Sequence, residues 1–154
     1  MAASDDSPPG NEVKPADYSR WALQTVQRGA WAPLTLIAIH AVALFGLDAY
    51  EHFPPIDIPM HFFGGVSAAY FLRWALLIAP ECGLGKTVAL STVNRRVLAM
   101  TFAITVLWEI AEFWIDRTRG THLQLGPADT AGDMFLGTLG AVALLACIKN
   151  NSAK

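Results

Sequence analysis

Two carboxylates stand inside an apolar stretch of this sequence. Glu109 and Glu112 lie in residues 97–115, which otherwise have the composition of a membrane-spanning helix. A charge in hydrocarbon costs several kcal/mol, roughly 2.5–3.5 on insertion scales, so such acids usually face a partner or water and indicate function. Together with Asp116 they occupy positions i, i+3 and i+7, within roughly 60° of one helix face. We therefore expect a cation, a proton or other polar groups to compensate this acidic face.

Two further segments carry polar pairs at helical spacing. Asp57 and His61 are four residues apart, as are Asp129 and Asp133, so each pair shares one face of its helix. Carboxylates combined with one imidazole suit Mn, Fe, Zn or Mg, and such an ion removes the repulsion between like charges. The sequence therefore predicts a divalent-metal site within a helical bundle. Its predicted ligands are Asp57, His61, Glu109, Glu112, Asp129 and Asp133.

Composition identifies the solvent around these helices. The chain has 154 residues, enough for one domain, and is 53% hydrophobic but only 16% charged. Four apolar runs follow one another: residues 31–47, 60–79 (bracketed by Pro59 and Pro80), 97–115 and 134–148, the last extended at its start by 129–133. Each is near the ~20 residues that cross a bilayer. We predict an all-α integral membrane bundle of four transmembrane helices, with the lipid bilayer as its partner.

The remaining segments are short. Residues 1–30 are predicted to form a disordered, proline-rich tail followed by an amphipathic helix at the membrane interface. The transmembrane domain then covers residues 31–148, and residues 149–154 form a cytoplasmic tail. The net charge of −2 gives no reason to expect nucleic acid as a partner.

The basic residues predict how the bundle is oriented. Eight of them lie in the N-terminal segment, the loop between the second and third spans, and the C-terminal tail. Arg117 and Arg119 are the two in the loop between the third and fourth spans. By the positive-inside rule both termini are cytoplasmic. The polar ends of the second, third and fourth helices then share the non-cytoplasmic side, so the predicted ligands converge.

Three sequence elements carry a family resemblance. They are Asp57-x-x-x-His61-Phe-x-x-Gly65, then Glu109-x-x-Glu112-Phe-Trp, and finally Gln124-x-Gly126-x-x-Asp129-Thr-x-x-Asp133-Met followed by Gly140-Ala141. This pattern covers roughly residues 55–141 and resembles the YjdF-like family of small bacterial inner-membrane proteins. The resemblance implies a multi-pass protein of the bacterial inner membrane. Because the family's biochemical function is uncharacterised, the resemblance implies no reaction.

We favour a metal-dependent membrane hydrolase that acts at the outer leaflet on a lipid-linked or phosphate-bearing substrate. In this hypothesis His61, Asp129, Asp133 and one of the two glutamates hold a metal that activates water, and the other glutamate is the general base. One alternative is a proton or ion carrier, which needs polar groups that continue toward the cytoplasm. The others are a hydrogen-bond network that only holds the bundle together, and a structural subunit of a homo-oligomer or larger membrane complex.

Overall fold

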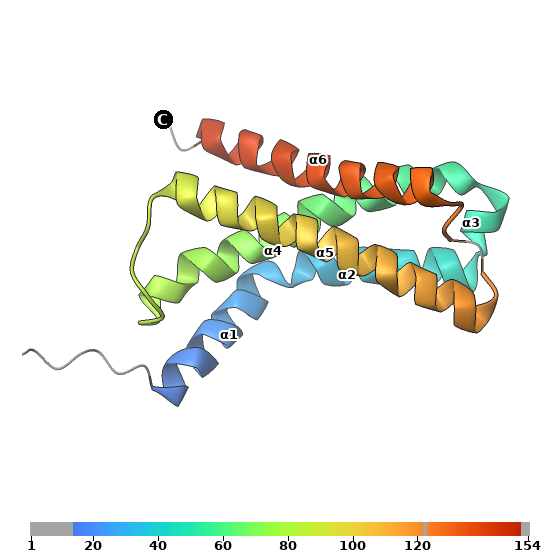
Figure 1. The fold of residues 1–154 in the computed structure, drawn as a ribbon. Coiled ribbons are helices and arrows are strands. Elements are labelled where there is room, and N and C mark those ends of the chain that lie inside the picture. The colour runs from blue at the N-terminus through green and yellow to red at the C-terminus, as the bar shows by residue number, and fades with distance from the viewer. Residues whose placement is uncertain (1–13, 122, 152–154) are drawn as a thin grey trace, which may run out of the picture.

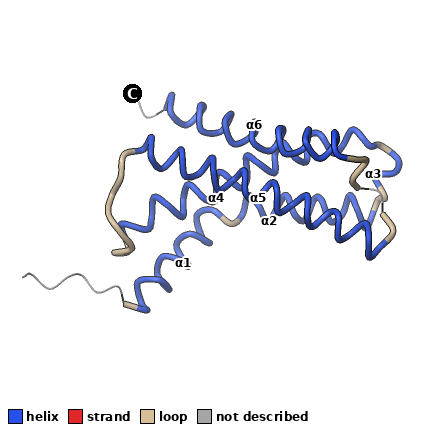
Figure 2. Tube along the Cα trace, viewed as in Figure 1, coloured by secondary structure: helices blue, strands red, loops and turns tan. Residues whose placement is uncertain are grey.

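The computed structural model describes residues 14–121 and 123–151, and these residues form helices and loops with no strand (Figures 1 and 2). The predicted all-α class is thereby confirmed. The predicted tail up to residue 13, His122 and the last three residues lie outside the described part. The elements in chain order are α1 (Pro15–Gly29), α2 (Trp31–Ala41), the π-helical turn η1 (Val42–Gly46), α3 (Ala49–His52), the 3-10 turn η2 (Pro54–Ile56), α4 (Asp57–Glu81), α5 (Leu90–Arg119) and α6 (Pro127–Asn151).

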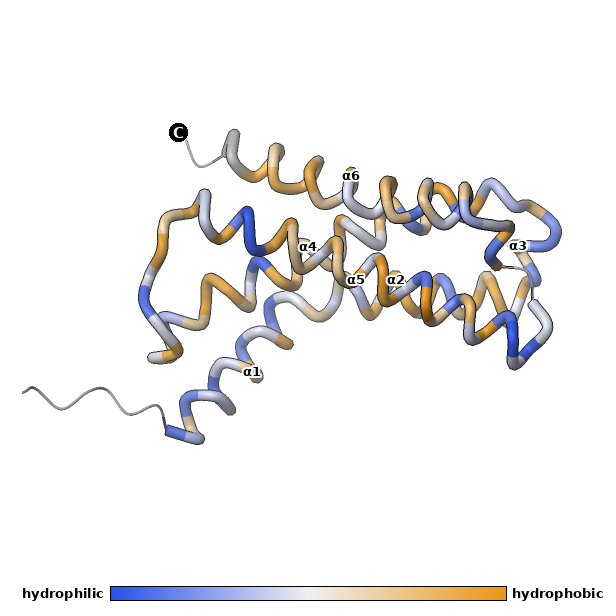
Figure 3. Tube along the Cα trace, viewed as in Figure 1, coloured by the Kyte–Doolittle hydropathy of each residue, from blue (hydrophilic) through white to orange (hydrophobic). Residues whose placement is uncertain are grey.

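Three helices are long and apolar enough to cross a membrane on their own, namely α4 (with η2), α5 and α6. A fourth span exists if α1 and α2 with η1 are taken together as one bent helix pair, which turns by 58° at its break. Apolar residues predominate along the long helices, and many of the hydrophilic residues lie toward the ends of the bundle (Figure 3). Large side chains such as Leu107 and Phe135 are more than 60% exposed, as expected for surfaces that face lipid.

The prolines at the predicted limits of the second span lie inside α4. The helix begins at Asp57 and ends at Glu81, and it includes both Pro59 and Pro80. Proline is tolerated in the first turn because the backbone N–H there has no partner within the helix. Because α4 begins at Asp57 rather than at residue 60, Asp57 and His61 lie on one face of the same helix.

Glycines bring α4 and α6 into close contact. A Cβ atom on Gly65 would overlap the carbonyl of Gly137, and one on Gly140 would overlap the carbonyl of Phe62. Small residues at such positions allow helix backbones to approach each other within a membrane. The side chain of Thr105 on α5 also packs against Gly137. This contact fixes the start of α6 beside the first turns of α4, and thereby positions Asp133 relative to His61.

The start of α4, the end of α5 and the start of α6 lie at the same end of the bundle, next to α3 (Figure 1). The loop between α4 and α5 and the start of α1 lie at the other end. Below the polar end, the buried core is a cluster of apolar residues contributed by all three long helices. This cluster consists of Ala69, Leu72, Val93, Val97 and Ala141.

Candidate functional site

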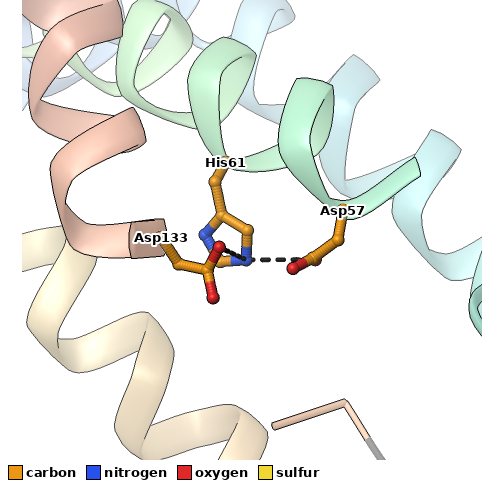
Figure 4. Close-up of side chains that lie close together, drawn as sticks. All are labelled: Asp57, His61 and Asp133. Carbon is orange, nitrogen blue, oxygen red and sulfur yellow. Dashed lines mark ion pairs between the residues drawn. The ribbon is translucent and has the colours of Figure 1, made fainter. Parts of the chain in front are cut away.

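His61 lies at the centre of a buried group of carboxylates. Its Nε2 is 3.2 Å from an oxygen of Asp57, one turn earlier on α4, and 3.9 Å from an oxygen of Asp133 on α6. The three side chains point toward one another from the two helices (Figure 4). His61 and Asp133 are only 7% and 6% exposed. The predicted i, i+4 pairing of Asp57 with His61 is therefore present, and α6 adds a second carboxylate.

The two glutamates of α5 approach His61 from the other side. Oε1 of Glu112 lies 3.8 Å from His61 Nε2, and Oε1 of Glu109 lies 3.8 Å from His61 Nδ1. Both glutamates are buried, with exposures of 2% and 5% respectively. Glu112 also accepts a hydrogen bond of 2.8 Å from the indole N–H of Trp108. Four carboxylates from three helices thus surround one imidazole.

The donor atoms form two overlapping groups with the spacing of metal ligands. Asp57, His61 and Asp133 form one, and His61, Glu109 and Glu112 form the other. In each group the three ligand atoms lie within 4.8 Å of one another. His61 belongs to both groups, so the choice of its nitrogen decides which carboxylates share an ion with it.

A loop segment holds Glu109 in place. The side-chain amide of Gln124 donates to the Glu109 backbone carbonyl at 2.9 Å and to its Oε2 at 3.1 Å. Asp116 in turn accepts hydrogen bonds from the backbone N–H groups of Leu123 and Gln124 and from the Thr121 hydroxyl, at 2.6–3.0 Å. Asp116 therefore organises the loop between α5 and α6. Sequence reasoning assigned no role to Gln124, because its contact depends on how this loop folds back.

One Glu109 oxygen has no such support. Oε1 is buried and lacks a hydrogen-bond partner among the described residues. A buried acceptor without a partner costs about 1–3 kcal/mol, and more when it is charged. It is the oxygen that faces His61 Nδ1.

Asp129 is the predicted ligand that the structure leaves apart from the others. One of its oxygens accepts a hydrogen bond of 2.9 Å from the Leu125 backbone N–H, just before α6 begins. Among the described residues it belongs to neither of the two metal-ligand groups. Its position fits a carboxylate that stabilises the start of a helix.

A cavity of about 130 Å³ adjoins the cluster between α2, α4 and α5. Asp57, His61 and Glu112 line its polar part, together with His40 of α2. The remaining lining is mainly apolar, for example Leu36, Met60 and Ile104. A reactive centre at the polar part would thus face a small apolar chamber.

His40 on α2 is buried and has a hydrogen-bond partner in another helix. Its Nδ1 lies 2.6 Å from the hydroxyl of Tyr50 in α3, and its ring contacts the edge of Trp108. Burial raises the pKa of the Tyr50 hydroxyl, and the charges of Asp57 and Glu112 add to this effect. The phenol therefore stays protonated. No sequence periodicity links residues 40 and 50, because the turns between them set this contact.

Comparison with known protein families identifies the family of this chain. Residues 14–151 match a family described as "Predicted membrane protein (DUF2238)". The chain belongs to this family. The match agrees with the predicted resemblance to the YjdF-like membrane proteins. No curated protein and no solved structure matches the chain. The family description identifies a membrane protein and names no chemical role.

Proposed function

We propose that this membrane protein binds one divalent metal ion through His61 Nε2, Asp57 and Asp133. The observation that carries the proposal is the convergence of these three donors where α4 and α6 meet, with His61 and Asp133 buried and Asp57 partly buried. Ligand atoms about 2.0–2.2 Å from a tetrahedral ion lie roughly 3.3–3.6 Å apart. The distances of 3.2 and 3.9 Å from Nε2 bracket that value, so small side-chain movements complete the site.

Glu109 supports the choice of Nε2 as the ligand. Metal-bound histidines almost always present their other ring N–H to a carboxylate or carbonyl, which fixes the ring orientation and the tautomer. Oε1 of Glu109, which has no hydrogen-bond partner among the described residues, is 3.8 Å from Nδ1 and can accept from that N–H after a small movement. In this arrangement Glu109 orients His61, and its Oε1 gains a hydrogen-bond partner.

Three protein ligands leave a coordination position for water, as in catalytic metal sites. A divalent ion in such a site lowers the pKa of bound water toward neutrality and so supplies a nucleophile for hydrolysis. Glu112 is placed to act as the general base, because it adjoins Nε2 and also lines the cavity. These features support a metal-dependent hydrolase. In this proposal the protein resides in the bacterial inner membrane with both termini cytoplasmic, so the site opens to the outer leaflet.

The apolar core of the bundle does not favour a proton or ion carrier. A carrier needs polar groups or water along the whole length of the bundle. Chains of charged or polar side chains mark such pathways in membrane proteins. The face of α5 that holds the glutamates continues through Thr105 and Thr101, and then reaches Val97 and Val93 in the core. The cluster therefore resembles a site at one end of the bundle more closely than one station of a relay.

Asp133→Asn and Asp129→Asn test the site with a matched pair of variants. We expect Asp133→Asn to lose stoichiometric Mn or Zn in the full-length, detergent-purified protein, since it removes a charged ligand. Asp129→Asn keeps an oxygen acceptor for the Leu125 N–H and should keep the metal. Metal content is measured by inductively coupled plasma mass spectrometry. Equal metal content in the two variants would contradict this ligand assignment.

A further inference from the structure

The surface beside the metal-ligand cluster carries a second, larger hollow. A groove of about 500 Å³ runs between α2 and α4 and reaches α6, and its lining is almost entirely apolar. Trp31, Ile39 and Phe63 line it and are each more than 50% exposed. In a bilayer such side chains face lipid, so the groove is open to the membrane interior.

The groove and the smaller cavity are neighbours. Leu36, Met60 and Ser67 line both of them, so the same side chains form the boundary between the two spaces. When these three side chains move apart, a molecule with a long apolar chain can lie in the groove while its other end enters the cavity beside His61. The cavity, about as large as one that holds benzene, admits only a small group.

His40 is a buried polar residue in the wall of the cavity. It is 93% buried and lines the cavity, and its Nε2 has no hydrogen-bond partner among the residues that the structure describes. Its Nδ1 is already paired with the Tyr50 hydroxyl, which fixes the ring. A buried ring nitrogen without a partner is costly, and a polar ligand atom in the cavity would satisfy it.

We infer that the cavity and the groove together bind a single-chain lipid whose small polar headgroup contacts His40 Nε2 and whose chain lies in the groove between α2 and α4. This inference rests on the proposed function, because it names the substrate class of the same site. The headgroup is uncharged, as in a monoacylglycerol. Asp57 and Glu112 line the cavity, and Glu109 and Asp133 lie within 4 Å of His61 behind them. One divalent ion offsets only part of this negative charge, so an anionic phosphate headgroup is repelled.

Gly64 provides the most direct perturbation. It lines the cavity, and a Cβ at this position would meet only Leu36, at an ordinary contact distance of 3.7 Å. Gly64→Leu therefore fits the backbone and fills the cavity. Gly46→Leu is the matched control, because Gly46 is exposed and lies outside the cavity lining. His40→Phe keeps a ring against Trp108 but removes Nε2, and Tyr50→Phe removes only the partner of Nδ1.

Native mass spectrometry of the full-length protein counts bound monolauroylglycerol, dodecyl phosphate and metal in the same spectra. We expect one monolauroylglycerol per chain in the wild type and in Gly46→Leu, and none in Gly64→Leu. His40→Phe should weaken binding about three- to tenfold, as for one lost hydrogen bond, whereas Tyr50→Phe should change it less. Unchanged binding in Gly64→Leu and His40→Phe, or a preference for dodecyl phosphate, would overturn the inference.

The metal signal separates the two proposals. A wild-type protein that carries metal but no monolauroylglycerol contradicts the lipid inference alone. A protein that carries monolauroylglycerol in the cavity but no metal contradicts the proposed metal site alone.

Discussion

Adding one methyl group at the contact between α4 and α6 should disrupt the metal site without touching a ligand. The variant is Gly65→Ala, whose Cβ would overlap the carbonyl of Gly137. The two helices must then separate by about 1 Å or more, at an overpacking cost of about 1–3 kcal/mol. Two ligands of one ion are at most about 4.2 Å apart when each bond is about 2.1 Å. His61 Nε2 and Asp133 already lie 3.9 Å apart, so this movement takes them beyond reach of a shared ion.

Gly64→Ala is the matched control for this experiment. It adds the same methyl group one residue earlier, where the Cβ has an ordinary contact with Leu36. Metal content by inductively coupled plasma mass spectrometry and thermal unfolding should be recorded for both variants. We expect Gly65→Ala to lose the metal and to unfold at a lower temperature, while Gly64→Ala keeps both properties. Stoichiometric metal in a folded Gly65→Ala protein would refute the claim that this contact sets the geometry of the site.

Three further predictions concern charge, topology and the loop. Replacing Glu109 and Glu112 together by Gln should leave the metal-free protein at least as stable as the wild type, because buried charge is removed, but should weaken metal binding about ten- to a hundredfold. A chelator should then destabilise the wild type by about 2.7 kcal/mol when free metal was a hundredfold above its dissociation constant, and the double variant by less; equal chelator effects would contradict this. A reporter fused at Lys154 should be cytoplasmic and one inserted near Glu51 external. The reverse result would contradict the predicted position of the site on the non-cytoplasmic side. Asp116→Ala should speed amide hydrogen exchange at Leu123 and Gln124, and unchanged exchange would show that its hydrogen bonds do not hold the loop.

Much of the fold follows from local sequence patterns. Spans of about 20 apolar residues predict membrane helices, and the four-residue spacing places Asp57 beside His61, as observed. The bend between α1 and α2 is not encoded in hydropathy, and neither is the π-helical turn after His40. These features result from packing against other elements, which periodicity within one helix does not report.

The site shows the same division. Helical spacing identifies the acidic face of α5, but not that Trp108 donates to Glu112 or that Gln124 reaches Glu109, because both contacts depend on side-chain direction and loop path. Asp129 shows that helical spacing alone does not determine which partner a carboxylate contacts. It shares the i, i+4 pattern with Asp133, yet it lies in the first turn of α6, where its carboxylate accepts a hydrogen bond from the Leu125 backbone N–H.

The most direct test of the central claim is the metal content of the full-length protein, purified in detergent after growth with Mn and Zn, for the wild type and for His61→Ala. The proposed site predicts about one divalent ion per wild-type chain and none in His61→Ala, because His61 is shared by both possible ligand groups. A folded wild type that takes up no ion, or a His61→Ala variant that binds as much as the wild type, would contradict the account.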